Sequence, residues 1–340
     1  AAPAPAVKPT VTLVPARPVP VAAPRVGKNP GLTRVVLDLP AGVTYTVAPS
    51  GAGVRVTLQN VSVGAASARN VSPELAEWRL EPGNGGAVLT LRPTFALGAR
   101  SGYRSALLPS GEGSTNQRLV VDLSPALADV TPVTTADVTL PAFTSPVRIV
   151  LDPGHGGVDP GAIGSVVEKV VTLDVARRVR AILAAAGAEV VLTRETDTQI
   201  STDKQTDLAG RAAFGTPPST LLVSIHVNSL EKNMALRGYG VETWWYPNDE
   251  GSAALAASLQ SAVTRLTGAS SRGVHRNSLA VLRKARVPAA LVEIGFASHP
   301  VDGLNLQSPA YLDRVAAGIA WGIREFLLPQ DALADVTDGR

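Results

Sequence analysis

The sequence lacks cysteine altogether and has only four histidines among its 340 residues. The absence of cysteine excludes disulfide bridges, thiol nucleophiles, iron–sulfur clusters and every zinc site with thiolate ligands. Any metal site must therefore be built from imidazole and carboxylate groups. Long hydrophobic runs are missing too. No stretch approaches the roughly 18 consecutive apolar residues of a membrane-spanning helix, so the sequence does not predict a transmembrane protein.

Aromatic residues and dense basic runs are also scarce. The chain has 4 Trp, 5 Tyr and 5 Phe, and its 31 Lys and Arg nearly balance 28 Asp and Glu, which argues against a nucleic-acid partner. A length near twice that of a usual domain, with 45% hydrophobic residues, predicts two domains with real cores. The start with small residues and no initiator Met is typical of a bacterial protein after signal-peptide removal. We therefore expect an exported monomer in the periplasm or cell envelope.

The distributions of proline and of charged residues divide the chain into segments. Residues 1–30 contain eight of the 27 prolines, which predicts a linker, and a second Pro-rich linker is expected at 127–146. Residues 31–126 show short alternating hydrophobic runs between turn residues, the pattern of an all-β sandwich. Residues 1–126 hold 12 basic and 6 acidic residues, whereas 127–340 hold 19 and 22. The basic domain either docks on an anionic cell-envelope polymer or has an ordinary solubilising surface.

Strands and helices alternate after residue 146. Strands are expected at 147–151, 189–193, 221–225, 240–246 and 289–294, and helices at 168–186, 252–266 and 310–327. This order predicts an α/β domain over 147–329, with a largely parallel central sheet flanked by helices and a tail at 330–340. In such a sheet, active sites collect at the carboxyl ends of the strands.

Polar residues follow those strand ends. His155 lies in a Gly-rich loop, His226 ends a buried strand, Glu168 opens a helix and Glu293 lies in an apolar strand. A lone histidine at either position is more often structural, and an acidic residue at a helix start is favoured by the helix dipole. A carboxylate in so apolar a strand is costly unless it is paired or bound to metal. Together, two histidines and one glutamate form the ligand set of a catalytic zinc site, and Glu293 supplies a general base for amide hydrolysis.

These motifs carry a resemblance to a known family. They are residues 152–157, Glu168, 192–194, 224–228, 281–283 and 292–296. On them, residues 147–328 resemble the zinc-dependent N-acetylmuramoyl-L-alanine amidases. The resemblance implies zinc bound by His155, Glu168 and His226, catalysis by Glu293, and cleavage of the amide between N-acetylmuramic acid and L-Ala of the peptidoglycan stem peptide.

Three more residues are candidate substrate contacts. Arg283 either binds a stem-peptide carboxylate or the oxyanion, or is a solvated charge at a strand end. His275 follows Arg272 and either contacts a peptide carboxylate or lies in a solvated loop, and Asn228 belongs to the second histidine motif. The remaining histidine, His299, is expected in a turn before Pro300.

The chain departs from the family pattern in places. The segment 197–211 is several residues longer than expected, and Gly215, Thr216 and His299 replace the usual residues. These changes affect substrate contacts and loop shape rather than the metal set. The short span 228–240 leaves little room for the blocking helix of some relatives, which predicts constitutive access.

Residues 31–126 resemble, more weakly, the β-rich AMIN-like domain that holds such amidases at peptidoglycan. Two rival functions remain open at this point. One is a zinc peptidase that cuts within the stem peptide with the same ligands. The other is a non-catalytic peptidoglycan-binding or activator protein, against which the presence of both histidines and both glutamates argues.

Overall fold

The structure is a computed structural model that describes residues 17–51, 53–83, 85–111 and 113–328. The predicted tail at 330–340 and the first half of the predicted 1–30 linker lie outside these residues. The chain divides into two compact units, one β-rich and N-terminal, the other α/β and C-terminal. No helix in the described part of the chain is long and apolar enough to cross a membrane.

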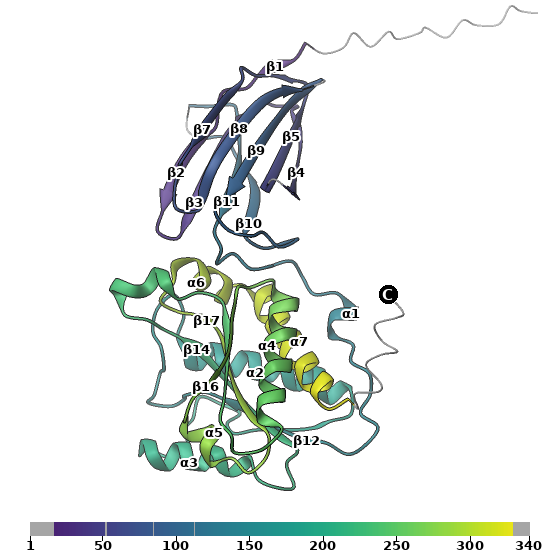
Figure 1. Cartoon of the computed structure of the whole chain (residues 1–340), viewed down its shortest axis with the longest axis vertical. Coiled ribbons are helices and arrows are strands. Elements are labelled where there is room, and N and C mark those ends of the chain that lie inside the picture. Colours follow the sequence, from purple (N-terminus) through teal and green to yellow (C-terminus); the bar gives the residue numbers. More distant parts are fainter. Residues whose placement is uncertain (1–16, 52, 84, 112, 329–340) are drawn as a thin grey trace, which may run out of the picture. The chain divides into compact units, whose positions relative to one another are not determined.

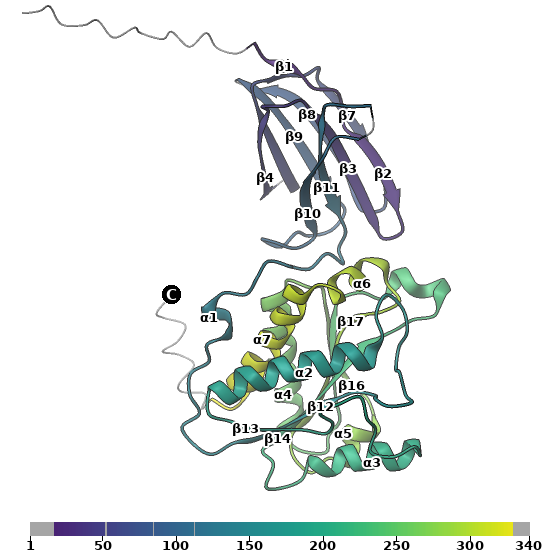
Figure 2. The same ribbon diagram turned by 180° about the vertical axis from the view of Figure 1, so that it is seen from behind.

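The N-terminal unit is built from strands, as predicted. One sheet has the order β10-β11-β3-β2, a second the order β4-β5-β9-β8-β7, and β1 pairs with β6. Figures 1 and 2 show the two larger sheets as stacked layers. The strands are β1 (Val19–Pro20), β2 (Arg25–Asn29), β3 (Leu32–Leu39), β4 (Thr44–Ser50), β5 (Gly53–Gln59), β6 (Val61–Ser62), β7 (Ala66–Arg69), β8 (Leu75–Gly83), β9 (Gly86–Pro93), β10 (Tyr103–Leu108) and β11 (Gln117–Leu123).

Alternating residues form the core of this unit. In β5, Val54, Val56 and Leu58 are buried while the residues between them are exposed or half-buried. The predicted linker at 1–30 differs from the structure, because β1 and β2 lie within it. Strand β2 contains no proline and forms a sheet edge, and proline is tolerated in short edge strands such as β1.

The C-terminal unit contains a six-stranded sheet of order β13-β12-β14-β17-β15-β16. Four of these strands run in one direction, but β15 is antiparallel to β17, and β16 is parallel to β15. The sheet is therefore mixed, with four parallel strand pairs and one antiparallel pair. The strands are β12 (Arg148–Pro153), β13 (Glu189–Leu192), β14 (Leu221–Asn228), β15 (Val241–Trp245), β16 (Ser271–Arg276) and β17 (Ala289–Phe296).

Helices cover both faces of this sheet. The long helices α2 (Glu168–Ala185), α4 (Ser252–Thr267) and α7 (Pro309–Phe326) pack on one face, where their apolar residues join the main core. The short helices α3 (Lys204–Phe214) and α5 (Ala280–Lys284) lie against each other and contribute to a smaller core on the other face. The sequence pattern predicted the three long helices and missed α3, α5, β16 and α6 (Pro300–Leu306). Figure 2 shows α2 and α7 crossing the sheet.

The predicted linker at 127–146 is ordered against α7. It contains α1 (Thr135–Val138), and Leu127 and Ala128 are buried. The buried Arg314 donates to the carbonyls of residues 131 and 132, and Arg324 donates to those of residues 141 and 142. Arginine side chains on α7 thus satisfy the backbone of a segment that sequence composition marks as a spacer.

Helices α4 and α7 approach too closely for a side chain at Gly318. A Cβ there would lie 2.6 Å from the Cα atom of Val263. Helix propensity alone predicts that Gly318→Ala stabilises the protein by roughly 1 kcal/mol. We expect the opposite sign: overpacking lowers the free energy of unfolding by about 1–3 kcal/mol. Urea titration followed by circular dichroism measures this change, and a gain in stability would contradict the close approach.

Candidate metal centre

The carboxyl ends of β12, β14 and β17 meet at one edge of the sheet. Asp152 is the Cα partner of Ser224, and His226 is the Cα partner of Glu293. Because side chains alternate along a strand, His226 lies on the same face as Leu222, and Glu293 on the same face as Leu291. Both leucines belong to the core beneath α3 and α5. Strand pairing therefore sets His226 and Glu293 side by side on that face.

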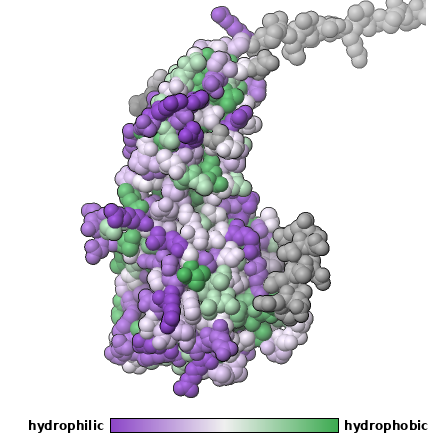
Figure 3. All heavy atoms as spheres, viewed as in Figure 1, coloured by the Kyte–Doolittle hydropathy of each residue, from purple (hydrophilic) through white to green (hydrophobic). Residues whose placement is uncertain are grey.

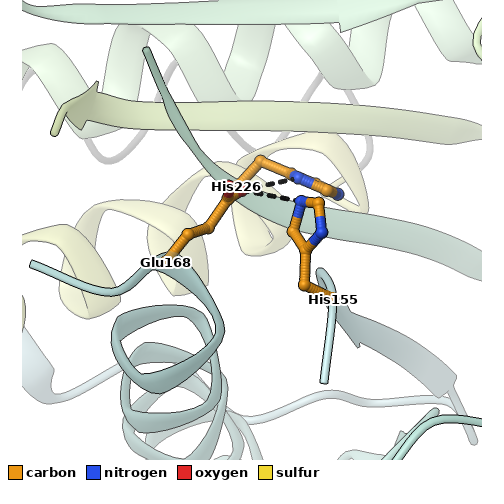
Figure 4. Close-up of side chains that lie close together, drawn as sticks. All are labelled: His155, Glu168 and His226. Atoms are coloured by element: carbon orange, nitrogen blue, oxygen red, sulfur yellow. Dashed lines mark hydrogen bonds and ion pairs between the residues drawn. The ribbon is translucent and has the colours of Figure 1, made fainter. Parts of the chain in front are cut away.

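Three predicted ligands come together at this edge (Figure 4). Nε2 of His155 lies 3.2 Å from Oε1 of Glu168, and Nδ1 of His226 lies 2.8 Å from the same oxygen. The donor atoms of all three residues lie within 4.8 Å of one another. Glu168 is 3% exposed and also accepts hydrogen bonds from the amides of Ala162 and Val227. These bonds hold its carboxylate in place between the two imidazoles.

The charges in this group stabilise one another. Burial alone would raise the pKa of Glu168, but hydrogen bonds from His155 and His226 outweigh it and hold the pKa well below its usual value. Burial likewise lowers the pKa of His155, yet Glu168 and Asp159 raise it above its usual value. Oδ2 of Asp159 lies 2.9 Å from Nδ1 of His155, although the ring N–H is poorly aligned for a hydrogen bond. The site thus combines a buried carboxylate with two imidazoles, a set of groups that could hold a metal ion.

The loop that carries His155 has an unusual backbone. His155 has a φ of +62°, a left-handed conformation that costs energy for a residue with a side chain. Nη2 of Arg211 donates to its carbonyl oxygen at 2.6 Å, and Nη1 donates to Asp152 at 3.0 Å. Arg194 donates to the carbonyls of Pro153 and Gly154. Two buried arginines therefore hold the loop in a conformation that it would not adopt alone.

Asp152 pairs with Arg211 beneath this loop. It is fully buried, which alone would raise its pKa, but Arg211 and the hydroxyls of Thr193 and Ser224 outweigh burial and lower it. Oδ1 accepts from Thr193 at 2.6 Å, and Oδ2 accepts from Ser224 at 2.7 Å. The carboxylate is therefore fully partnered and supports the loop without facing a ligand.

Glu293, unlike Asp152, has a buried oxygen, Oε2, with no hydrogen-bond partner among the described residues. Burial, followed by the negative charges of Glu168 and Glu242, raises its pKa well above the usual value. A buried carboxyl group with an unpartnered oxygen and a raised pKa is a candidate for proton transfer.

The structure also places Glu242 next to Glu293, as its Cα partner across the β15–β17 pair. Glu242 is 4% exposed and accepts hydrogen bonds from Asn228 (2.7 Å), Trp244 (3.2 Å) and Arg272 (2.8 Å). Glu242 was not predicted from the sequence, although a carboxylate within the apolar strand 240–246 is the same signal that marked Glu293.

The three candidate substrate contacts have different positions. Asn228 is bound to Glu242 rather than free. His275 lies on strand β16 instead of a loop, where it is half-buried and its ring contacts Trp244 at a centroid distance of 4.9 Å. Arg283 lies on helix α5 instead of a strand end, and it donates to Ser278. Among the described residues, Arg283 has no hydrogen bond or ion pair with the three metal-ligand candidates.

His299 caps helix α6. Its Nδ1 accepts from the amides of Val301 and Asp302, and burial lowers its pKa to about 4. Asp302, which the sequence analysis missed, is also buried, and burial raises its pKa to about 7. Its Oδ2 accepts from the amides of Gly240 and Phe296 and so ties the start of β15 to the end of β17.

The span between the second histidine and β15 is short, as expected. Between Asn228 and Gly240 the described chain has no helix longer than η1 (Lys232–Arg237), whose residues are exposed or half-buried. Met234 and Leu236 are among the exposed apolar side chains of the protein.

Comparison with known proteins agrees with this geometry. Residues 149–325, about half of the chain, match the N-acetylmuramoyl-L-alanine amidase family. The germination-specific N-acetylmuramoyl-L-alanine amidase of Bacillus subtilis (strain 168) is 34% identical over 189 residues, which cover 52% of this chain and 78% of that protein. The probable cell wall amidase LytH of Staphylococcus saprophyticus is 33% identical over 182 residues, which cover 52% of this chain and 57% of that protein.

A solved structure gives a similar match. The N-acetylmuramoyl-L-alanine amidase from Clostridium difficile 630 is 31% identical, with a TM-score of 0.49. The match covers 54% of this chain and 98% of that one. On the family match and the Bacillus relative, this chain belongs to the N-acetylmuramoyl-L-alanine amidase family.

Proposed function

We propose that the chain hydrolyses the amide between N-acetylmuramic acid and L-Ala of the peptidoglycan stem peptide. The observation that carries this proposal is the group of His155, Glu168 and His226, with Glu293 on the same face of the sheet as His226. Family membership supplies the substrate class. Because peptidoglycan lies outside the cytoplasm, the proposal includes export to the periplasm or cell envelope.

Zinc is the metal that fits this donor set. Two imidazole nitrogens face one carboxylate oxygen at distances that let a single ion contact all three. The absence of thiolate and the presence of three protein ligands match a catalytic rather than a structural zinc site. When bound, the ion supplies Lewis acidity to the water and to the scissile carbonyl.

The proposed proton transfers belong to Glu293. Its carboxylate takes a proton from the attacking water and delivers that proton to the amide nitrogen as the C–N bond breaks. The free amine of L-Ala and the lactoyl carboxylate are the products, and Glu293 returns to its starting state. Its buried surroundings, which raise its pKa, suit a group that must both accept and release a proton.

Product analysis tests this reaction. Purified protein is incubated with zinc and isolated peptidoglycan, and the soluble products are identified by mass spectrometry and by labelling of new amino termini. We expect intact stem peptides with L-Ala at the amino terminus and no new reducing sugars. Shorter peptides would show a peptidase, new reducing ends would show a glycosidase, and no release would show a non-catalytic wall-binding protein.

We further propose that the N-terminal AMIN-like unit holds the enzyme at the wall. Arg55 and Arg79 are both Cα partners of Thr90, so they share the outer face of the five-stranded sheet. Arg92 and Arg69 are both Cα partners of Glu77 and share that face. Figure 3 shows hydrophilic side chains on one side of this unit. Arg69, Arg79 and Arg92 pair with Glu77 on this face, and the net positive charge that remains favours contact with an anionic polymer of the envelope.

A triple variant tests this role. We expect R55Q/R69Q/R92Q to pellet with isolated cell wall several-fold less than the unchanged protein at low salt, because three positive charges are removed. Hydrolysis of a soluble muropeptide should stay within about twofold. The double variant R180Q/R265Q, on the catalytic unit, is the control. Equal pelleting of the triple variant and the unchanged protein would exclude this face.

A further inference from the structure

The segment 197–211 lies against the loop that carries His155. Oδ1 of Asp197 accepts from the amide of Gly157 at 2.9 Å, and Oε1 of Gln199 accepts from that of Val158 at 2.6 Å. A Cβ on Gly157 would lie 2.2 Å from Oε1 of Gln199. The segment therefore fits closely against the backbone just after the first metal-ligand candidate.

One side chain of the segment reaches further. Lys204, the first residue of α3, donates from Nζ to Oδ2 of Asp159. The same oxygen lies 2.9 Å from Nδ1 of His155, while Nε2 of His155 faces Glu168. Asp159 thus lies between the lysine and the ring nitrogen that does not face the metal site. Its other oxygen accepts from the amide of Gly161, which fixes the carboxylate at both ends.

A carboxylate beside the second ring nitrogen of a histidine is common in metal sites. A histidine ligand usually has a carboxylate or carbonyl at its other ring nitrogen, and that partner fixes the orientation of the ring. Asp159 is one-third exposed, so without Lys204 only the amide of Gly161 and the ring of His155 hold it. We propose that Lys204 is a positioning residue for zinc binding. It holds Asp159 against Nδ1 of His155 and so keeps Nε2 directed at the metal site.

The sign of the effect separates this role from simple charge repulsion. A lysine near a dication repels it, so removing the charge alone would strengthen zinc binding. If Lys204 instead positions Asp159, removal of the lysine weakens zinc binding. The inference rests on the metal site of the proposed function. Zinc affinity tests the role of Lys204 without any hydrolysis assay.

The test is a competition titration of the full chain with a chromophoric zinc chelator. We expect Lys204→Met to lower zinc affinity roughly two- to fivefold at low ionic strength. Lys204→Arg should restore affinity to within about twofold, and Lys232→Met, a change at an exposed lysine of η1, should leave it unaltered. The melting temperature of the metal-free protein is measured in parallel, so that a folding defect is recognised.

A double-mutant cycle tests whether Lys204 acts through Asp159. Asp159→Asn should cost roughly 10- to 100-fold in zinc affinity, and adding Lys204→Met to it should cost nothing more. Additive losses, or an affinity that is unchanged or higher in Lys204→Met, would overturn the inference. If the unchanged protein binds no zinc at all, the proposed metal site itself fails, which is a distinct result.

Discussion

Glu293→Gln should strongly slow amide hydrolysis while the protein keeps its zinc. The substitution preserves the shape of the side chain but removes its capacity to take a proton from water. General acid–base groups contribute about 10²- to 10⁴-fold to rate, so we expect kcat on a soluble muropeptide to fall by that factor. Zinc affinity should change less than about threefold, since the three metal-ligand candidates are untouched.

Stability supplies a second readout for the same variant. Glu293 is a buried carboxyl whose Oε2 has no hydrogen-bond partner, so a neutral amide should leave the free energy of unfolding of the metal-free protein unchanged or higher at neutral pH. Glu250→Gln, at an exposed position, is the matched control for charge removal. Retained hydrolysis in Glu293→Gln would remove this residue from the mechanism, and lost zinc would show that it is a ligand.

The candidate site was largely predictable because its residues conflict with their local sequence. Glu293 interrupts an apolar strand, and His226 ends one. Such conflicts mark function, since burial of a lone carboxylate costs energy that packing does not return. Proximity was predictable too, because parallel strands bring their carboxyl ends to one edge of a sheet.

The residues that hold the metal-ligand candidates in place were less predictable from the sequence. Lys204 and Asp159 are 45 positions apart, and each looks like an ordinary surface charge. Arg211 lies on α3, a helix that was not predicted from the sequence, so its bond to the carbonyl of His155 was not predicted either. These contacts depend on where a long loop folds back, and hydrophobic periodicity does not encode that.

Fold prediction failed where proline composition was taken as a guide. Residues 127–146 look like a spacer, yet Arg314 and Arg324 of α7 bind the carbonyls of this segment. Each proline lacks a backbone donor but keeps its carbonyl acceptor. Long cationic side chains elsewhere in the chain can therefore order it, which composition alone does not reveal. The mixed sheet has a similar cause, because strand direction depends on connections rather than on pattern.

Removing a metal ligand should have an effect as large as removing the base, but by a different route. We expect Glu168→Gln and His226→Ala each to lower zinc affinity by more than about 100-fold. This loss exceeds the usual loss of affinity when a residue that hydrogen-bonds to a metal ligand is changed. Glu168→Gln keeps the shape of the side chain but loses the negative charge and, because the amides of Ala162 and Val227 donate to different oxygens, one of these two hydrogen bonds. Hydrolysis should fall in proportion to zinc occupancy and recover in part at high zinc concentration.

Thermal melting separates metal loss from misfolding in these variants. If zinc is held at about 1,000 times its dissociation constant, linkage adds about 4 kcal/mol to the unchanged protein. For a unit of this size that corresponds to a melting temperature roughly 8–16 °C higher with zinc than with a chelator. The ligand variants should lose this zinc-dependent shift, whereas Glu293→Gln should keep it. A shift that survives in Glu168→Gln would mean that zinc binds elsewhere, and a shift absent from the unchanged protein would contradict the metal centre itself.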